Sequence, residues 1–192
     1  MFAKIAFETY VLITPGRICS NIYLIESEGK KLLIDAGDGS VGLDFKPDVC
    51  ILTHGHFDHT AGVKPDWHRV LLHPDEFDFK GPYIKIPKNA AQNPMEPIRF
   101  GKHILEFFHT PGHTQGSICV LDKKTGALFS GDTLFADGIH GRTDLGGDEW
   151  EMLQSLKRLK NLPYKLLCPG HGEIERNGQE AGKRISKHEE SY

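Results

Sequence analysis

Apolar residues gather along the chain in short runs, each ended by a polar or glycine-containing turn. This pattern is typical of β-strands rather than of long helices. Residues 27–30 and 122–126 contain the glycine and polar residues of hairpin turns, so we expect each to join two antiparallel strands. The predicted strands are residues 4–13, 21–26, 31–35, 49–52, 69–73, 104–108, 117–121, 127–130 and 165–168.

One stretch, residues 148–161, has helical spacing instead. Asp148 can cap its first turn, and Pro163 ends it. The apolar residues that share one face of this helix are Met152, Leu153, Leu156 and Leu159. We also expect a short helix following the segment 51–62, and a polar helix with a frayed end from residue 176 onward.

Consecutive predicted strands have no crossover helices between them, which argues against a doubly wound parallel sheet. Two mixed β-sheets packed face to face, with helices outside, fit the order of elements better. The fold class we expect is therefore α+β. The 192 residues have room for one sizeable core, so we expect a single domain, residues 1–192.

Residues 79–97 interrupt this rhythm of strands. The segment has four prolines and little periodicity, which predicts a long surface loop. Long loops in small domains are often disordered or cover a functional site. We favour the covering role over disorder.

Composition excludes several classes of partner. Hydrophobic residues make up 39% and charged residues 26%, as in ordinary globular proteins, and the net charge of −3 gives no basic surface for nucleic acid. No apolar run approaches the ~18 residues of a membrane span, and residues 1–13 lack the pattern of a signal peptide. We therefore expect a small-molecule substrate and neither a nucleic acid nor a membrane partner; the sequence does not indicate an oligomeric state.

The cysteines point to the compartment. The four are widely spaced and form no C-x-x-C pair, and Cys50 and Cys119 lie within apolar runs. Small buried hydrophobic residues explain them better than disulfides do. We expect a reducing cytoplasmic location.

Eleven histidines are many for this length, and three of them follow the predicted strand 49–52 closely. In an extended segment alternate side chains share a face, so His54, His56 and Asp58 point the same way. His59 is out of phase and can face a second ion only if the chain turns. This spacing predicts two metal ions side by side rather than one.

Three further strands end in turns that carry a histidine or an aspartate. The sequence reads His109-Thr110-Pro111-Gly112-His113-Thr114, then Gly131-Asp132-Thr133, then Pro169-Gly170-His171-Gly172. Active sites in sheet proteins favour such strand ends. Sorting the ligands by type gives one set with His54, His56 and His113 and a second with Asp58, His59 and His171. Asp132 has two oxygens and can bridge the sets.

Histidine and carboxylate ligands without a nearby thiolate suit zinc, iron or manganese. Three protein ligands plus solvent are typical of an open, catalytic zinc site. We therefore expect two divalent ions, zinc first, with iron or manganese as alternatives. Two roles stay open for Asp35, at the end of the strand 31–35: it orients a ligand, or it forms an Asx turn.

The motifs THGHFDH, TPGHT, SGDT and PGHG, in that order, resemble those of the metallo-β-lactamase superfamily. The resemblance spans residues 21–171 and implies a four-layer αββα sandwich with a dinuclear site. Within the superfamily the chain is similar to the glyoxalase II group of hydroxyacylglutathione hydrolases, in which an aspartate at the position of Asp132 bridges the metals.

Two departures separate the chain from glyoxalase II proper. We expect no C-terminal helical domain for glutathione, since little sequence follows His171. Gly141-Arg142-Thr143-Asp144 also replaces the Gly-Lys-x-Tyr pattern of the glutathione thioesterases. The replacement is similar to short glyoxalase II-like hydrolases and to persulfide dioxygenases.

The resemblance implies a hydrolase of 2-hydroxyacyl thioesters. Two ions about 3.5–4 Å apart can share one solvent molecule and lower its pKa towards ~7. The resulting hydroxide attacks the thioester carbonyl, and Asp58, which also binds metal, orients it as the catalytic residue. The leaving thiolate, whose parent pKa is near ~8.5, needs little help from an acid. Arg142 can bind a substrate carboxylate, or it forms an ion pair with Asp144 or Asp148.

Two other functions compete with this one. The first is a persulfide dioxygenase-like oxidoreductase with one iron held by His54, His113 and Asp132. The second is a metal-binding module without catalysis. We expect His73 to be structural, and His109 either to be structural or to support a ligand from behind. Of His68, His103, His140 and His188, only His140, beside Gly141 and Arg142, is a candidate for a place near the site.

Overall fold

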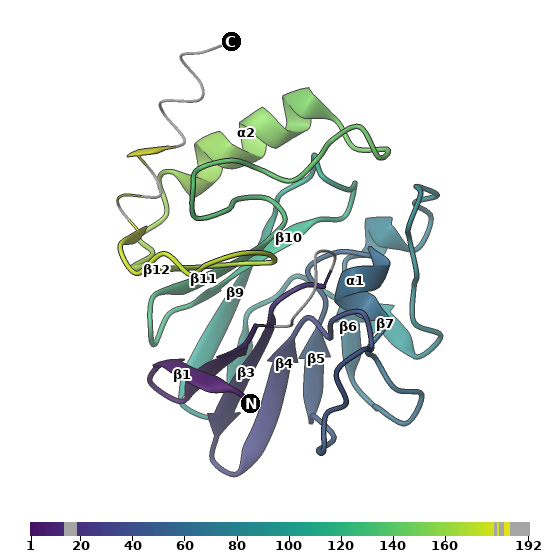
Figure 1. Cartoon of the computed structure of the whole chain (residues 1–192), viewed down its shortest axis with the longest axis vertical. Helices are drawn as coiled ribbons and strands as arrows, with labels where there is room; N and C mark the ends of the chain where they lie inside the picture. The colour runs from purple at the N-terminus through teal and green to yellow at the C-terminus, as the bar shows by residue number, and fades with distance from the viewer. Residues whose placement is uncertain (14–18, 179, 181–182, 185–192) are drawn as a thin grey trace.

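The computed structural model describes residues 1–13, 19–178, 180 and 183–184. Its first sheet has seven strands in the order β1-β2-β3-β4-β5-β6-β7. Strands β1 to β4 are antiparallel, whereas β4 to β7 run parallel, so the sheet is mixed (Figure 1). The strands are β1 (Ala3–Ala6), β2 (Thr9–Leu12), β3 (Ile22–Ser27), β4 (Lys30–Ile34), β5 (Val49–Ile51), β6 (Val70–Leu72) and β7 (Ala90–Gln92).

The second sheet has five strands in the order β12-β11-β10-β9-β8. Its pairs are antiparallel except β11 with β12, which is parallel. This sheet is therefore mixed as well. The strands are β8 (Ile98–Phe100), β9 (His103–His109), β10 (Ile118–Asp122), β11 (Ala127–Gly131) and β12 (Leu166–Pro169).

Alternation along the strands divides the apolar residues between three clusters. The inward faces of both sheets form the central cluster, in which Tyr23 of β3 contacts Phe129 of β11 with ring centroids 5.1 Å apart. Leu24, Leu33 and Cys50 point outward from the first sheet into a second cluster. A third cluster lies on the outer face of the second sheet. Burial of apolar surface on both faces is what holds the layers together.

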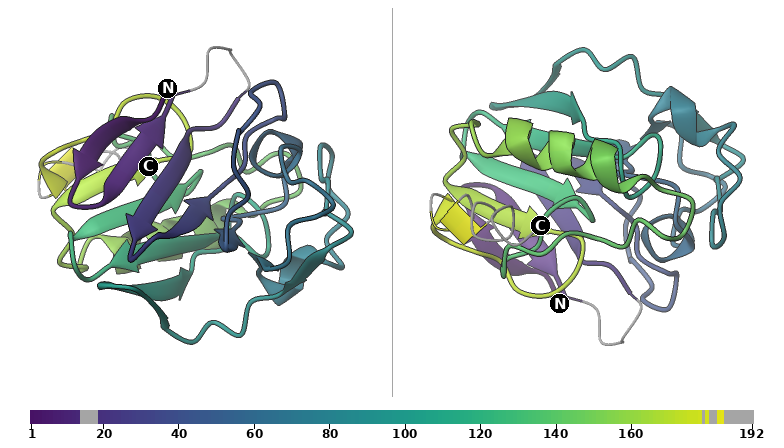
Figure 2. Two further views of the ribbon diagram at one scale, coloured as in Figure 1. Left: turned by 90° about the horizontal axis from the view of Figure 1, so that it is seen from below. Right: turned by 90° about the horizontal axis from the view of Figure 1, so that it is seen from above.

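Helix α2 (Glu149–Leu159) covers the outer face of the second sheet with Met152, Leu156 and Leu159 (Figure 2). The Asp148 side chain accepts a hydrogen bond from the Glu151 N–H, 2.8 Å, and caps the helix as predicted. On the first sheet the outer layer is thinner and consists of α1 (Phe57–Thr60), the short 3-10 helix η1 (Pro74–Glu76) and loops.

These layers confirm the predicted class, two mixed sheets packed face to face with helices outside. The hairpin that joins β3 to β4 is also as expected, with Glu28 and Gly29 at positive φ. Some details were wrong. The predicted strand 4–13 is a hairpin of β1 and β2, because Glu8 turns the chain at φ 51°. Strands β7 and β8 were not predicted, and the short helix α1 lies within the segment 51–62 rather than after it.

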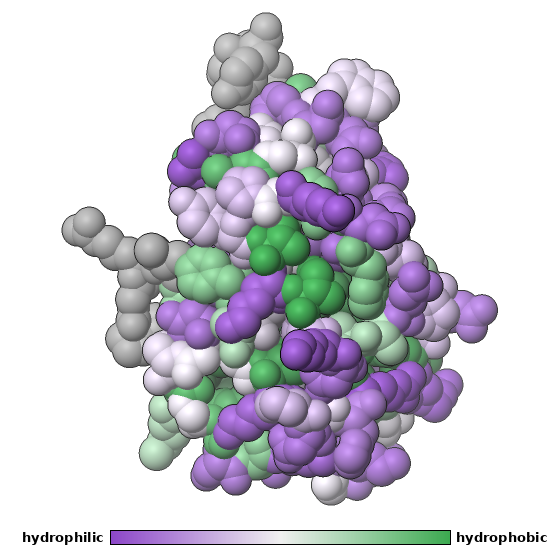
Figure 3. Space-filling view, turned by 90° about the vertical axis from the view of Figure 1, so that its right-hand side faces the viewer, coloured by the Kyte–Doolittle hydropathy of each residue, from purple (hydrophilic) through white to green (hydrophobic). Residues whose placement is uncertain are grey.

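The predicted helix from residue 176 lies largely outside the described residues. In the part of the chain that the structure describes, no helix is long and apolar enough to cross a membrane. The surface on the side of α1 and β7 carries apolar residues at its middle, bordered by hydrophilic residues (Figure 3). The four cysteines are free and buried, as their positions in the sequence predicted.

Replacement of Phe129 by alanine is expected to destabilise the fold by about 3–5 kcal/mol, because the ring is fully buried between the sheets and the cavity cannot collapse. Denaturant unfolding of the metal-free protein measures this loss. Trp150→Ala is the matched control, since this ring is 69% exposed, and should change the free energy of unfolding by no more than about 0.5 kcal/mol. Equal losses in both variants would contradict the packing described above.

Candidate metal centre

The seven side chains predicted as metal ligands meet at one edge of the sandwich, each near the end of a strand. One stretch between β5 and the end of α1 supplies four of them. The turns after β9, β11 and β12 supply the others. All are buried except His171, whose side chain is 29% exposed. The residues are His54, His56, Asp58, His59, His113, Asp132 and His171.

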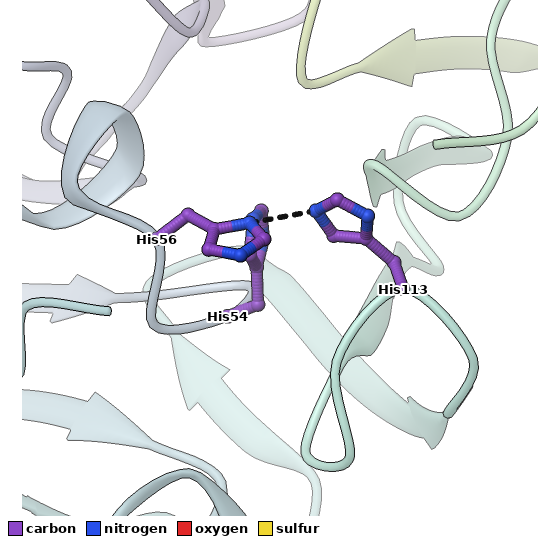
Figure 4. A group of neighbouring side chains, drawn as sticks. All are labelled: His54, His56 and His113. Carbon is purple, nitrogen blue, oxygen red and sulfur yellow. Dashed lines mark hydrogen bonds between the residues drawn. The ribbon is translucent and has the colours of Figure 1, made fainter. Parts of the chain in front are cut away.

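Three histidine rings form the first group. His56 Nδ1 lies 3.1 Å from His54 Nε2 and 2.8 Å from His113 Nε2. His113 approaches from a loop opposite the stretch that carries the other two rings (Figure 4). The three nitrogens therefore face a common point.

Asp58, His59 and His171 form the second group. His171 Nε2 lies 3.1 Å from Asp58 Oδ2 and 3.4 Å from His59 Nε2. His59 reaches this group because α1 turns the chain directly after His56, as the out-of-phase spacing predicted.

Asp132 lies between the groups. Its Oδ1 is 3.3 Å from His59 Nε2, and its Oδ2 is 3.5 Å from both His113 Nε2 and His171 Nε2. One carboxylate thus contacts ligands of both groups, which is the geometry that a bridging role needs.

The Asp35 carboxylate orients two of the rings from behind. Its Oδ2 accepts a hydrogen bond from His59 Nδ1 at 2.8 Å and another from the Thr53 hydroxyl. Its Oδ1 accepts one from the Thr53 backbone N–H. The Thr53 hydroxyl in turn accepts from His54 Nδ1 at 3.1 Å. Nδ1 of both rings is therefore engaged, which leaves Nε2 of each to face the site. Of the two roles left open for Asp35, the structure shows the orienting one.

His113 is oriented in the same way by backbone. Its Nδ1 donates to the Arg142 carbonyl oxygen at 2.7 Å, so its Nε2 also carries a lone pair. Gly141 allows this approach, because a Cβ there would lie 2.9 Å from His113 Nδ1. The segment after β11 thus contributes to the site through its main chain.

These donors fit divalent metal ions. Lone pairs that face one another at about 3 Å repel unless a cation or a proton lies between them. Burial and the neighbouring His113 lower the pKa of His56 to about 4, so this ring is neutral. Burial alone would raise the pKa of Asp132, but His59 and His171 hold it well below its usual value. Neutral imidazoles beside ionised carboxylates are what a divalent cation binds.

A cavity of about 540 Å³ opens onto both groups. Part of the loop 79–97 forms one wall, since the Phe57 N–H donates to the Tyr83 carbonyl, 2.9 Å, and the Lys85 N–H to that of Gly55, 2.8 Å. Only Tyr83 of the described segment 79–97 lines the cavity, and residues 90–92 form β7, so the covering role expected of this loop is met by its first part alone. The cavity is lined by His56, Phe57, Asp58, Tyr83, His113, Asp132, Phe135, His140, Gly141, Arg142, Leu145 and His171.

Arg142 lines the cavity but also has a partner. Its guanidinium donates two hydrogen bonds to Asp144, of 2.8 and 2.7 Å, with both side chains exposed. Of the alternatives given for Arg142, the structure shows the pair with Asp144. His140 lies beside it, 3.3 Å from Glu149.

His73 and His109 stack with ring centroids 4.2 Å apart and nearly parallel planes. With Asp75 they make a fourth group of metal-ligand type. The in-plane lone pairs of stacked rings lie in separate, nearly parallel planes and do not converge on one ion. His109 Nε2 is also bonded to the Gln115 carbonyl oxygen, 2.8 Å. A structural role, expected for His73 and left open for His109, agrees with this geometry.

Sequence reasoning missed one buried acid beside the site. Glu76 is 0% exposed and accepts hydrogen bonds from the backbone of two ligand-bearing loops. A lone glutamate after a Pro-Asp pair has no spacing that marks it, so only the fold reveals its position. The apolar wall of Phe57, Tyr83, Phe135 and Leu145 was also not predicted.

The sequence that forms this site matches a known protein family. Residues 16–65 and 64–171 match the family model described as the Metallo-beta-lactamase superfamily. All seven side chains of the two groups lie within these ranges.

Curated relatives are similar over most of the chain. A hydroxyacylglutathione hydrolase of Salmonella typhi is 33% identical over 77% of this chain. An atrochrysone carboxyl ACP thioesterase of Aspergillus fumigatus is 30% identical over 84%. The chain spans only 59% and 53% of these two relatives. The probable metallo-hydrolase YqgX of Bacillus subtilis is 32% identical over 82% of this chain and 87% of its own length.

Solved structures are similar as well. The B3 metallo-beta-lactamase BLEG-1 superposes with a TM-score of 0.73 and 30% identity, over 90% of this chain and 95% of that one. TTHA1623, solved in a di-iron-bound form, gives a TM-score of 0.67 and 32% identity, over 88% and 96%.

Metal binding should release protons from this centre. Burial would lower the pKa of His171, but its hydrogen bonds to Asp132 and Asp58 outweigh burial and raise the pKa to about 9. In the metal-free protein this proton stabilises the fold below the ordinary histidine pKa, and the stabilisation is lost as pH rises through about 9. Zinc needs the same lone pair, so binding near neutral pH should release at least about one proton per chain, and fewer above about pH 9.

Calorimetric zinc titration in two buffers of different ionisation enthalpy counts these protons. His171→Gln should lower the count by about one. Zinc binding without any proton release would contradict the charge state assigned to His171.

Proposed function

Because the chain belongs to the metallo-β-lactamase superfamily, we propose that it is a hydrolase of thioesters that uses two divalent ions. His54, His56 and His113 would hold the first ion, Asp58, His59 and His171 would hold the second, and Asp132 would contribute its carboxylate to both. Zinc is the first candidate, and iron or manganese are alternatives. The free, buried cysteines are compatible with a reducing cytoplasmic location.

One observation carries the proposal: the side chains of both groups lie together, and hydrogen bonds from behind orient three of the five rings, His54, His59 and His113, so that their other nitrogen faces the site. Asp35 accepts a hydrogen bond from His59 Nδ1, and the Thr53 hydroxyl accepts one from His54 Nδ1. The Arg142 carbonyl oxygen accepts one from His113 Nδ1. A module without a bound cation gains nothing from such an arrangement, because the facing lone pairs repel.

Two bound ions would supply Lewis acidity and lower the pKa of water. Asp58 would accept a hydrogen bond from the attacking water and orient it toward the substrate carbonyl. Burial would raise the pKa of Asp58, but His171 and His59 keep it below its ordinary value, so the carboxylate is ionised at neutral pH. An ionised acceptor at this position is what the role requires.

Among the described residues that line the cavity, no carboxyl group is held protonated to serve the leaving atom. The two carboxylates there, Asp58 and Asp132, both have a lowered pKa. Outside the proposed metal ligands, the side chains of donor type in the lining are Tyr83, His140 and Arg142. An amide or alkoxide leaving group would need an acid, whereas a thiolate with a parent pKa near ~8.5 needs little help. This scarcity of acids supports a thioester as substrate.

The names of two relatives, a hydroxyacylglutathione hydrolase and an acyl carrier protein thioesterase, also support a thioester. A 2-hydroxyacyl thioester of the glyoxalase II kind fits best. Whether its thiol is glutathione is a separate question, since Gly141–Asp144 departs from the pattern of the glutathione thioesterases. The apolar wall and Arg142 would contact the part of the substrate beyond the carbonyl.

The alternative, an iron oxidoreductase, would use His54, His113 and Asp132 only. The geometry favours the hydrolase, because Asp58, His59 and His171 are also brought together. Oxygen consumption with glutathione persulfide separates the two functions.

The zinc- or iron-loaded protein should hydrolyse S-lactoylglutathione or simpler thioesters. Asp58→Asn should lower kcat by about 10²–10⁴-fold, because the water loses its ionised acceptor. Asp44→Asn, an exposed position away from the cavity, is the matched control and should keep full activity. Metal content is measured for each variant. Failure of the loaded wild type on every thioester tested would refute the proposal.

Arg142→Gln distinguishes the contribution of the Arg142 side chain from that of its main chain. The His113 contact uses the Arg142 carbonyl, so metal content should stay unchanged. If the guanidinium leaves Asp144 for a substrate carboxylate, KM for S-lactoylglutathione should rise about tenfold while KM for an uncharged thioester stays constant. Equal KM changes for both substrates would restrict Arg142 to its pair with Asp144.

A further inference from the structure

Glu76 is a fully buried carboxylate that no ligand set includes. It closes η1, directly after β6, and is 0% exposed. Its Oε2 accepts a hydrogen bond from the Gly55 N–H at 2.7 Å, and its Oε1 accepts one from the Gly116 N–H at 2.8 Å. Each oxygen therefore holds a different loop.

The two loops are those that carry the three-histidine group. Gly55 lies between His54 and His56, and Gly116 closely follows His113. His113 and the other two rings come from different sheets, and their nitrogens must stay within about 3 Å of one another. One side chain with two acceptors can set that separation.

We propose that Glu76 is a positioning residue that sets the affinity of the three-histidine group for its metal ion by holding its two loops at a defined separation. The inference rests on the proposed dinuclear centre. It concerns one of the two groups only, because the described contacts of Glu76 reach neither Asp58, His59 nor His171.

Both loops have glycine where the carboxylate approaches. A Cβ at Gly55 would lie 2.5 Å from Glu76 Oε2, and a Cβ at Gly116 would lie 2.6 Å from Glu76 Cγ. Neither glycine has a positive φ, so backbone conformation does not require them. Glycine is required instead by the close approach of the Glu76 side chain, which leaves no room for a Cβ at either position. Both loops are therefore fitted around Glu76.

A carboxylate can hold both loops, because each of its two oxygens accepts a hydrogen bond. Burial raises the pKa of Glu76, whereas the Thr114 side chain and the two backbone N–H groups favour the charged form. Charge-assisted hydrogen bonds are roughly twice as strong as neutral ones. Glutamine has the same shape but only one acceptor, and its NH₂ would face one of the N–H donors. Glu76→Gln should therefore release one loop without leaving a cavity.

The test separates the two metal groups by removing one ligand from each. The His171→Gln background leaves the three-histidine group intact. The His113→Gln background leaves the group of Asp58, His59 and His171 intact. Zinc affinity is measured for the full-length, metal-free chain by competition with a chromophoric chelator. Adding Glu76→Gln should weaken zinc binding about 10–100-fold in the first background and leave it unchanged in the second.

Asp122→Asn is the control for a purely structural loss. This carboxylate is also 0% exposed, and it is bonded to His103 and Thr125 at the other end of β10. Asp122→Asn should lower the melting temperature and keep zinc affinity in both backgrounds. If Glu76→Gln behaves like Asp122→Asn, or weakens both groups equally, the inference is wrong.

If Glu76→Gln does not fold, Gly116→Ala replaces it, since its Cβ pushes on Glu76 Cγ and should weaken the same group. Unchanged affinity in that variant overturns the inference. Wild-type protein that binds no zinc at all would instead overturn the dinuclear centre, and this inference with it.

Discussion

The hydrogen bonds of Asp35 are the interaction on which the rest of the site depends. A buried carboxylate at φ 60°, a conformation that aspartate tolerates better than most residues, ends β4 and faces two imidazoles. The Asp35 carboxylate accepts a hydrogen bond from His59 directly, and it accepts one from Thr53, which in turn accepts one from His54. These bonds decide which nitrogen of each ring faces the site. Without the Asp35 carboxylate each ring could adopt either tautomer, and the lone pairs would not converge.

The sandwich gives this arrangement its rigidity. Apolar residues on both faces of each sheet hold the strands, and the ligands extend from strand ends where the chain can turn without disturbing the clusters. Contacts across the two sheets close the site: the Tyr23 hydroxyl donates to the Pro169 carbonyl, 2.6 Å, beside His171. A ligand that came from a loose loop would lose affinity through the entropy of ordering it.

Much of this could be predicted from sequence, because the information was local. Strand alternation and turn residues located most strands, and the spacing of His54, His56, Asp58 and His59 implied two ions. What failed needed tertiary knowledge. The turn at Glu8 has no glycine to mark it, and β7 and β8 lack the continuous apolar run that marks the equally short β5 and β6. Glu76 acts through backbone atoms of distant loops, which no pattern of side chains can encode.

The order of the ligands along the chain has a consequence for biosynthesis. The three-histidine group is complete once His113 has been made, whereas the second group waits for His171, after β12 has paired with β11. In a growing polypeptide the residues of the first group are therefore all present before β12 and the last residue of the second group have been made.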